Sequence, residues 1–460
     1  MAVKKKAENL TIAEKLAQAL VPESEQPYKV PKNWCWTTIS NVSKVISKGT
    51  TPSGGRTAYV GKGIAFLRVE NLNDDGTISH NDIVYIDNKI HCEQLKRSIL
   101  MQDDVLVSIA GTLGKTGIVR EIDLPMNTNQ AIAFIRLHNS VVLSKYIKYL
   151  LDSPVFKNLL VSKTKVTSIP NLTLEIIGDC VLPLPPFGEQ QHIVERIESL
   201  FVKLDDAKEK LQEVLDGFEI RKAAILHKAF SGELTAKWRE EHSVSFESWE
   251  NTNLGKYATA QYGFTESATN ELVGPKFLRI TDIQNGKVNW EKVPYCKIDE
   301  ESKDKYKLNI GDIVVARTGA TTGKCYLIVD DVDSVFASFL IRVSVDKSKI
   351  DTYYLYWFMQ SQQYWAQITE LSAGIAQPGV NGRKLVGLHI PIPTIEEQMA
   401  IVNLLNNEFA KEAYVKTKVE CVVKETEAIK KSILIRAFRG ELGTNNENDE
   451  SAIELIKTIL

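Results

Sequence analysis

The chain has 460 residues, of which 43% are hydrophobic and 25% charged, and its formal net charge is −2. This composition is ordinary for globular protein, and the near-zero charge excludes a chain whose whole surface attracts nucleic acid. The six cysteines form no C-x-x-C pair, no apolar run is long enough to cross a membrane, and no apolar segment follows the basic N-terminus, so we expect no zinc ribbon, membrane helix or signal peptide.

The first half of the chain begins with a short helix and a globular domain. Thr11 and Glu14 are spaced as in a capping box and predict a helix within an N-terminal segment of residues 1–27. Residues 28–186 alternate short β-type runs, such as "VLVSI" and "AIAFIRL", with turns rich in Gly, Asn and Asp, and include one helical stretch, "SKYIKYLLDS". This pattern predicts a compact α/β or α+β domain.

A long helix is predicted next, over residues 187–232, because apolar residues recur at alternating steps of four and three. Such heptad spacing is typical of a helix that packs against another helix. Gly232 is a natural helix stop. The apolar seam of this helix consists of Ile193, Ile197, Leu200, Leu204, Ala207, Leu211, Val214 and Phe218.

The second half repeats this order after a linker, residues 233–245. Residues 246–394 again predict an α/β domain, with runs such as "IVVAR" and "FLIRV" and one helical stretch, "TYYLYWFMQS". A second long helix is predicted over residues 395–440, and residues 441–460 form a polar tail with a short amphipathic helix. Glu408 and Glu412 interrupt the seam of this helix, whose apolar members are Ile401, Leu405, Val415, Val419, Val422, Ile429 and Ile433.

The two halves are copies of one unit. "LPLPPFGEQQHIV" corresponds to "IPIPTIEEQMAIV", and "KAFSGEL" corresponds to "RAFRGEL", at a constant offset of 208 residues, from Leu182 to Ile390 and from Lys228 to Arg436. This period is far longer than the roughly 20–50 residues of stacked repeats, so it indicates domain duplication. The predicted fold is therefore α/β (α+β), a duplicated globular domain followed by a long helix. We expect the two long helices to pair as an antiparallel coiled coil.

Two catalytic motifs are approximated but not met. "SIAGTLGKTGIV", Ser108 to Val119, contains Gly-Lys-Thr, but a Walker loop needs a glycine where Ile109 stands, and its twin "ARTGATTGKCYLIV" fails in the same way. "LPPF" has Leu184 where amino-group DNA methyltransferases carry a polar residue. The seven histidines show no metal-ligand spacing. We therefore predict a strand–turn–strand element, and no catalytic, cofactor-binding or metal-binding residues.

Two similar domains joined by helices suit a partner with two separated, similar features, such as duplex DNA. DNA binding requires Lys and Arg for phosphates, and amides or Arg for base edges. In the first copy the candidates are Lys48, Arg56, Arg68, Lys115, Asn129, Gln130, Lys163 and Lys165. In the second copy they are Gln261, Arg279, Arg317, Lys324, Gln377, Arg383 and Lys384.

Comparison of the two copies distinguishes residues that serve the same role in both domains from residues whose roles differ. Arg68 with Arg279, and Lys115 with Lys324, occupy equivalent places and are predicted to serve the fold, partner docking or DNA phosphates. Residues that differ at equivalent places are candidates for distinct base readout. The pairs of this kind are Ile109 with Arg317 and Asn71 with Asp282.

These repeated motifs resemble those of the specificity (S) subunit of type I restriction–modification systems. The match rests on "PLPPFGEQQHIV" with "PIPTIEEQMAIV", on "AILHKAFSGEL" with "SILIRAFRGEL", and on the two glycine-rich runs quoted above. It covers nearly the whole chain, in the order domain, helix, domain, helix. The N-terminal helix and the tail beyond Leu442 are outside the motifs that carry it.

The resemblance implies a non-catalytic subunit whose two target recognition domains each read one half of a bipartite, asymmetric site in double-stranded DNA. It also implies that the helices set the spacer and help to dock two modification subunits, through which restriction subunits join. S-adenosylmethionine would bind those modification subunits, so no cofactor is expected on this chain, which would work in a prokaryotic cytoplasm. Two alternatives remain open: a self-sufficient DNA adenine methyltransferase, and a duplicated protein-interaction scaffold without a DNA role.

Overall fold

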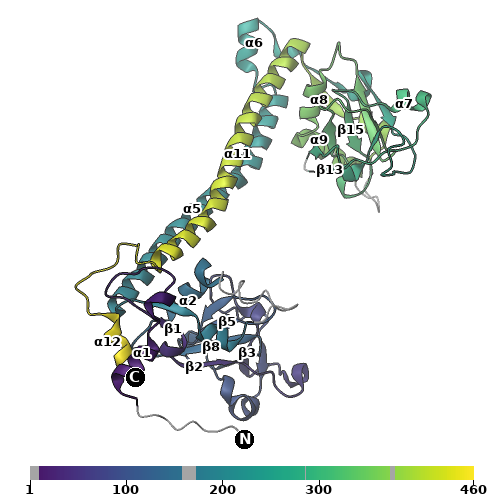
Figure 1. The fold of residues 1–460 in the computed structure, drawn as a ribbon. Coiled ribbons are helices and arrows are strands. Elements are labelled where there is room, and N and C mark those ends of the chain that lie inside the picture. The colour runs from purple at the N-terminus through teal and green to yellow at the C-terminus, as the bar shows by residue number, and fades with distance from the viewer. Residues whose placement is uncertain (1–9, 158–171, 285, 373–378) are drawn as a thin grey trace. The chain divides into compact units, whose positions relative to one another are not determined.

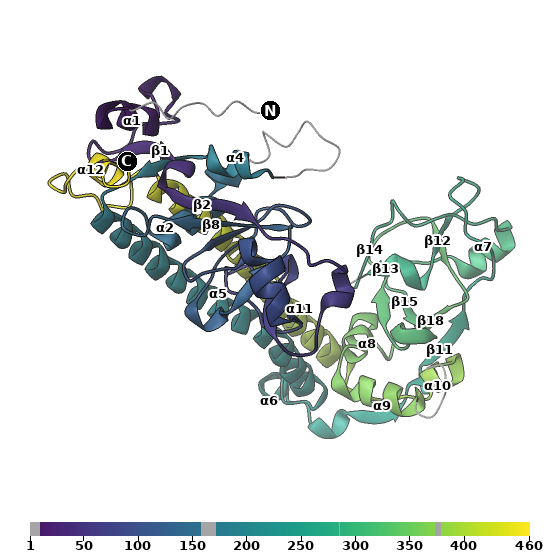
Figure 2. The same cartoon turned by 90° about the horizontal axis from the view of Figure 1, so that it is seen from below.

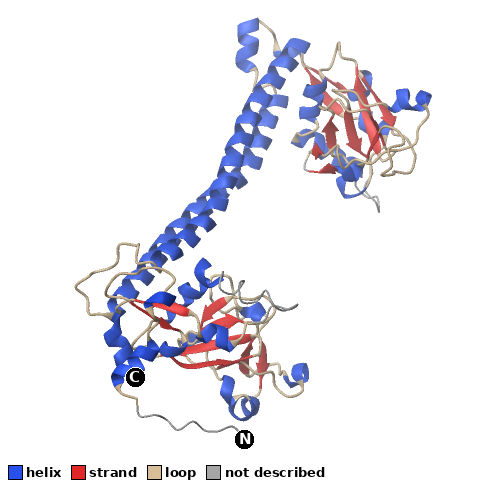
Figure 3. Cartoon of the chain, viewed as in Figure 1, coloured by secondary structure: helices blue, strands red, loops and turns tan. Residues whose placement is uncertain are grey.

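A computed structural model confirms the predicted fold class, with two α/β domains and two long helices (Figure 1). Helices and strands are mixed in both domains, and the strands form small sheets (Figure 3). The residues that the structure describes are 10–157, 172–284, 286–372 and 379–460.

The chain divides into two compact units, residues 1–210 with 422–460, and residues 211–421. Helix α5, Phe187–Phe230, begins in the first unit and ends in the second. Helix α11, Ile395–Ala437, begins in the second unit and ends in the first. Each unit therefore contains one globular domain and a part of each long helix.

The first unit is built around a four-stranded antiparallel sheet in the order β2-β8-β5-β6. Its other strands form a three-stranded sheet, β4-β3-β7, with β3 and β7 parallel, and a two-stranded ladder, β1-β9. The runs "VLVS" and "IAFIRL" are mainly apolar because the central strands β5 and β8 are largely buried on both faces. The strands are β1 Cys35–Thr38, β2 Ser43–Lys48, β3 Ile64–Leu67, β4 Val84–Ile86, β5 Val105–Ser108, β6 Thr116–Ile118, β7 Met126–Thr128, β8 Ile132–Leu137 and β9 Val181–Leu184.

Shorter helices complete the described part of the first unit. The predicted capping box begins the first of them, where the backbone N–H of Thr11 donates to Glu14 at 2.8 Å. The C-terminal tail returns to this helix, because Lys15 Nζ donates to the carbonyl oxygen of Leu460 at 2.9 Å and α12 lies beside α1 (Figure 2). The helices are α1 Ile12–Ala19, α2 Ser144–Asp152, α4 Leu174–Gly178 and α12 Ala452–Lys457.

The second unit repeats the topology of the first. Its four-stranded sheet has the order β11-β18-β15-β16, the ladder β10-β19 matches β1-β9, and the parallel pair β12-β17 matches β3-β7. The strands are β10 Glu250–Asn253, β11 Ala258–Tyr262, β12 Lys276–Leu278, β13 Ile283–Gln284, β14 Lys287–Val288, β15 Ile313–Ala316, β16 Cys325–Leu327, β17 Ser334–Phe336, β18 Leu340–Val345 and β19 His389–Ile392. The helices are α6 Ala236–His242, α7 Glu300–Tyr306, α8 Thr352–Phe358, α9 Gln362–Ser372 and α10 Gly382–Val386.

A buried tyrosine explains the proline-rich start of each long helix. Among the described residues, the strands β9 and β19 each pair with one neighbour, so Pro183 and Pro391 are tolerated there. Tyr146 of α2 donates to the carbonyl oxygen of Pro183 at 2.6 Å, and Tyr354 of α8 donates to that of Pro391 at 2.6 Å. The same bond therefore fixes the strand from which each long helix leaves its domain.

Each long helix ends with a phenylalanine inside the domain of the other copy. Phe230, the last residue of α5, contacts Tyr354 and Phe358 at centroid distances of 5.3 and 5.4 Å. Phe438, which follows α11, contacts Tyr146 at 5.2 Å. Both phenylalanines are buried. The repeated runs "KAF" and "RAF" thus anchor the far end of each helix.

The long helices pair in opposite directions (Figures 1 and 2). Within the first unit, Lys430 Nζ lies 2.6 Å from Asp205 Oδ1, and Lys208 Nζ lies 3.0 Å from Glu427 Oε1. Residue numbers rise along α5 while they fall along α11, which confirms the predicted antiparallel pairing.

The apolar seam predicted for α11 is partly wrong. The interruption predicted at Glu412 agrees with the structure, in which its Oε1 lies 3.4 Å from Arg221 Nε of α5. A charged residue occupies the face toward α5 because the partner helix supplies the opposite charge and the long side chains reach solvent. Three predicted members of the seam are 44–46% exposed: Val415, Val422 and Ile429.

The other predicted seam residues differ in burial. Phe218 is buried, Ala207 and Val214 are exposed, and five are half-buried: Leu200, Leu204, Leu211, Val419 and Ile433. The remaining four are fully buried and belong to the cores of the two domains: Ile193, Ile197, Ile401 and Leu405. The heptad signal near each helix start therefore reflects packing on a domain.

Candidate nucleic-acid interface

Three ends of the central sheet meet at one edge of the first domain, where β2 ends, β5 ends and β8 begins. Gly49, after β2, donates its N–H to the carbonyl oxygen of Ile132 at 3.0 Å. Ile109, after β5, donates to Ala131 at 2.8 Å and accepts from Leu172 at 3.3 Å. We call this edge, with the turn before β8, the strand-end edge.

The second domain builds the same edge with equivalent backbone bonds. Gly263 donates to the carbonyl oxygen of Leu340 at 3.2 Å, and Arg317 donates to that of Phe339 at 3.1 Å. Val380 donates to the carbonyl oxygen of Arg317 at 2.8 Å, as Leu172 does to Ile109. The scaffold is thus duplicated even where the side chains differ.

A glycine is required at this edge in both domains. A Cβ at Gly49 would collide with the backbone oxygens of Thr128 and Asn129, and one at Gly263 with those of the equivalent turn. The close approach brings the turn before β8 or β18 against the end of β2 or β11. The side chains of these two segments are therefore held close together at the strand-end edge.

In the first domain the strand-end edge carries polar side chains. Lys48, at the end of β2, is exposed, as is Gln130, whose amide oxygen accepts a hydrogen bond from Thr51. Arg56 is exposed on the loop that follows β2. Asn129 instead supports the turn, because its side chain accepts from the N–H of Ala131 at 3.1 Å.

In the second domain the edge carries aromatic residues and Arg317, whose guanidinium lies 4.9 Å from the ring centroid of Tyr262. Tyr262 stands where the first domain has Lys48. Phe339, whose carbonyl oxygen accepts the N–H of Arg317, is exposed. Sequence reasoning missed both aromatic residues, although Gly263 after Tyr262, like Gly49 after Lys48, could have identified that position. Arg383 is exposed on α10, next to this edge.

Several predicted DNA-binding residues are engaged within the protein. Lys115 Nζ lies 3.0 Å from Asp74 Oδ1 and donates to the carbonyl oxygen of Leu72 at 3.1 Å. Lys384 Nζ donates to the carbonyl oxygen of Leu371 at 2.7 Å, and Gln261 bonds Arg342. By contrast, Lys324 is exposed. Three candidates, Lys163, Lys165 and Gln377, lie outside the described residues.

Arg68 and Arg279 stabilise equivalent short turns after β3 and β12. Arg279 makes two bonds to the carboxylate of Asp282, at 3.0 and 2.8 Å, and Arg68 pairs with Glu70 at 2.8 Å. Asn71 and Asp282 both accept the N–H of the preceding arginine. The prediction that this pair reads different bases is wrong for Asn71, which is 1% exposed.

The glycine-rich run of the first domain forms the predicted strand–turn–strand element. Gly111 and Gly114 have φ values of 76° and 75°, which suit glycine in the tight turn between β5 and β6. Ser108 Oγ accepts the N–H of Lys115 at 2.8 Å. Because a strand rather than a helix follows, the amide cradle of a Walker loop does not form.

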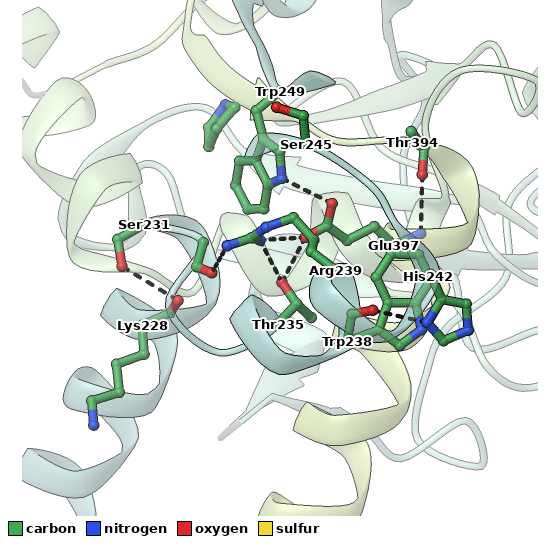
Figure 4. Close-up of polar contacts among 12 residues, drawn as sticks. Lys228, Ser231, Thr235, Trp238, Arg239, His242, Ser245, Trp249, Thr394 and Glu397 are labelled. Carbon is green, nitrogen blue, oxygen red and sulfur yellow. Dashed lines mark hydrogen bonds and ion pairs between the residues drawn. The ribbon is translucent and has the colours of Figure 1, made fainter. Parts of the chain in front are cut away.

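A buried carboxylate at the start of each long helix binds the segment that follows the other long helix. Glu397 Oε1 accepts from Arg239 Nη1 at 2.6 Å and from Thr235 at 2.7 Å, and Oε2 accepts from Trp249 at 2.9 Å (Figure 4). Arg239 belongs to α6, just after α5. The carboxylate therefore joins three separate segments of the second unit.

In the first unit the equivalent Glu189 binds neutral groups. It accepts from Trp34 Nε1 at 2.7 Å and from Asn445 Nδ2 at 2.7 Å. Burial raises the pKa of this carboxyl, while the bonds from Trp34 and Asn445 act in the opposite direction. The sequence identifies the Glu-Gln dipeptide as a repeated motif, but it does not predict that the carboxylate binds a segment distant in the chain.

The glutamine of the same dipeptide binds the helix next to it. Gln190 accepts the N–H of Leu143 at 2.9 Å and donates to the carbonyl oxygens of Val141 and Pro185. Gln398 repeats these bonds with the N–H of Asp351 at 2.8 Å and two carbonyl oxygens. The motif is therefore structural, which is why it recurs in both copies.

We expect Glu189→Gln to change how stability depends on pH. Because the folded pKa of Glu189 is raised above its ordinary value of 4.5, the wild-type fold loses stability as pH rises from 4.5 through the folded pKa. Glutamine does not titrate, so the stability of the variant should rise relative to that of the wild type across this pH range. Urea unfolding from about pH 4 to 8 measures the difference; parallel curves would contradict the burial effect.

The described residues hold no cluster of His, Cys, Asp or Glu suited to a metal ion. Within the same part of the chain, no helix is long and apolar enough to cross a membrane.

A family model described as the type I restriction modification DNA specificity domain matches residues 31–216 and 247–419. The chain belongs to this family. The two matches fall on the two copies, so the specificity domain occurs twice. The chain is thus a non-catalytic DNA-specificity subunit, and a self-sufficient methyltransferase is not supported.

Curated relatives of this specificity subunit include those of two type I restriction enzymes. The EcoKI subunit from Escherichia coli strain K12 is 24% identical over 90% of both chains. The MjaVIII subunit from Methanocaldococcus jannaschii is 27% identical over 91% of this chain and 95% of the relative.

Two solved structures share the fold of the specificity subunit. One, from work on complex assembly and conformational transition of the type I R-M system, has a TM-score of 0.70 at 18% identity and covers 90% of this chain and 100% of that chain. The HsdS subunit from Thermoanaerobacter tengcongensis has a TM-score of 0.61 at 19% identity and covers 91% and 100%.

Proposed function

We propose that each domain reads one half of a bipartite, asymmetric site in double-stranded DNA through its strand-end edge, from the major groove. The observation that carries this proposal is the duplicated backbone scaffold with different exposed side chains. Lys48 and Gln130 occupy the first edge, whereas Tyr262, Arg317 and Phe339 occupy the second. Equal scaffolds with unequal side chains suit two half-sites of different sequence.

The long helices and the domain surfaces beside them would set the spacer and dock two modification subunits. Each unit has exposed apolar side chains on its helices, such as Val202 and Ile429 in the first and Ile220 and Tyr414 in the second. Exposed apolar side chains along both long helices offer contact area to docked proteins. The docked subunits would bind S-adenosylmethionine and methylate adenine N6 in a prokaryotic cytoplasm, and restriction subunits would join through them.

Exchange of residues 28–186 for the corresponding domain of another specificity subunit tests the proposal. We expect the assembled complex to recognise a new sequence in one half-site and to keep the other half-site and the spacer. The reason is that each domain builds its own strand-end edge. Genome-wide mapping of N6-methyladenine reads both half-sites at once.

Two results would contradict this assignment. A change in both half-sites would mean that the domains do not read independently. A complex that shows no sequence preference with the unaltered chain would favour the protein-interaction scaffold, and methyl transfer by the purified chain alone would favour a self-sufficient methyltransferase.

A further inference from the structure

One partly buried arginine of the described residues has no carboxylate partner. Five others that are buried or half-buried each form an ion pair, and their pairs are Arg68–Glu70, Arg136–Asp104, Arg239–Glu397, Arg279–Asp282 and Arg342–Asp312. Arg317 forms none. Removing a guanidinium from water without a counter-charge costs free energy. The absence of a carboxylate beside Arg317 therefore requires an explanation.

The contacts of Arg317 leave hydrogen-bond donors unused. Its guanidinium lies 4.9 Å from the centroid of Tyr262, and Nη1 makes a single long bond of 3.4 Å to the carbonyl oxygen of Ser338. Its Nε is buried and has no hydrogen-bond partner. Arginine carries five donors in one plane, and the Nη donors of Arg317 beyond that single bond remain for a ligand.

The surroundings hold this side chain in place. The N–H of Gly382, at the start of α10, donates to the hydroxyl of Tyr262 at 2.9 Å and fixes the ring beneath the guanidinium. The backbone of Arg317 is bonded on both sides, to Phe339 and Val380. Such support lowers the entropy cost of binding, as a recognition residue requires.

We propose that Arg317 reads a guanine in the half-site of the second domain by donating two hydrogen bonds to O6 and N7. Among the four bases, guanine alone presents two acceptors side by side in the major groove, which matches the arginine fork. The inference rests on the proposed function and adds the residue and the base. At the equivalent place the first domain has buried Ile109, so its half-site lacks this contact.

Two substitutions of Arg317 test the proposal in the full chain assembled with its modification subunits. Arg317→Lys keeps the positive charge but loses the fork, and Arg317→Gln loses the charge. We expect both to relax one G·C position of the second half-site by about 5- to 150-fold and to leave the first half-site unchanged. Methylation mapping identifies the position, and competition binding with duplex oligonucleotides measures the ratio.

Replacement of that guanine by 7-deazaguanine, which lacks the N7 acceptor, provides the atomic test. The wild-type complex should lose affinity for the modified duplex, whereas the Arg317→Gln complex should bind both duplexes equally. Lys324→Ala is the control, because an exposed lysine on phosphate should weaken all sequences alike and reduce the salt slope by about 1.

The outcomes separate this inference from the proposed function. If the wild-type complex recognises a bipartite site and both Arg317 variants keep every base preference, the guanine contact is wrong while the function stands. Full rescue by Arg317→Lys would make Arg317 a phosphate contact and would also overturn the inference. If the wild-type complex shows no bipartite site, the proposed function itself fails.

Discussion

Replacement of Glu397 by glutamine should lower the free energy of unfolding of the second unit by about 3–5 kcal/mol. Glu397 is 0% exposed, and the side chain of its partner Arg239 is 10% exposed, so glutamine would leave a buried guanidinium without a counter-charge. The bonds from Thr235 and Trp249 would also lose a charged acceptor. Urea unfolding and hydrogen exchange of residues 231–249 measure the loss.

Glu189→Gln is the matched control, because the same substitution falls at the same place of the other copy. Glu189 accepts from neutral donors, so its loss should cost about 1 kcal/mol, as for an ordinary hydrogen bond. Adding Arg239→Met to Glu397→Gln should recover part of the stability, since the unpaired charge is removed. Equal losses in the two single variants would show that the ion pair contributes nothing specific.

Replacement of Phe438 by alanine should destabilise the first unit by about 3–5 kcal/mol. The ring is 0% exposed and meets Tyr146 edge-on, so its removal leaves a cavity where α11 joins the domain. The backbone oxygen of Phe438 also accepts from the hydroxyl of Tyr28 at 3.0 Å, and this bond ties the helix end to the N-terminal part of the chain. Denaturant unfolding gives the loss, and limited proteolysis reports release of the tail.

Val202→Ala provides the comparison for Phe438, since Val202 is 58% exposed on α5. Its replacement should change stability by no more than about 0.5 kcal/mol. Phe230→Ala should reproduce the large effect in the second unit, where the ring contacts Tyr354 and Phe358. A small effect of Phe438→Ala would mean that the tail alone holds α11 on the first domain.

The repeat made much of the fold predictable. A constant offset aligned "KAFSGEL" with "RAFRGEL", and alternating apolar runs separated by turns indicated two α/β domains. The heptad spacing predicted long paired helices, which the structure confirms. Local patterns succeed here because helix and strand periodicity follow from the backbone geometry of single segments.

The seam of α11 shows where the pattern failed. Val415, Val422 and Ile429 are spaced seven apart, yet they are exposed, although the interruption predicted at Glu412 agrees with its ion pair to Arg221. Which face of a helix is covered depends on the charges that its partner supplies, and the pairing register lies outside any local window. The same limit applies to Glu189 and Glu397, whose partners lie far away in sequence.

The candidate interface was predictable in kind but not in detail. Comparison of the two copies identified Arg317 as a residue that differs from its equivalent, Ile109. It also identified candidate lysines, but it gave no information about their contacts. Lys115 is held by Asp74 and Leu72, whereas Lys324 is exposed, although the two occupy equivalent places. Tyr262 became part of the site only when β11 was seen to end beside Arg317.

The amino-acid sequence thus established the duplication, the order of domains and helices, the absence of a Walker loop and the family, because each depends on residue identity and spacing along the chain. Only the folded chain showed which side chains share the strand-end edge and which carboxylates clamp returning segments. It also showed that Arg317 lacks a counter-charge. These properties arise from contacts between residues distant in sequence, whose burial and partners are set only when the chain packs.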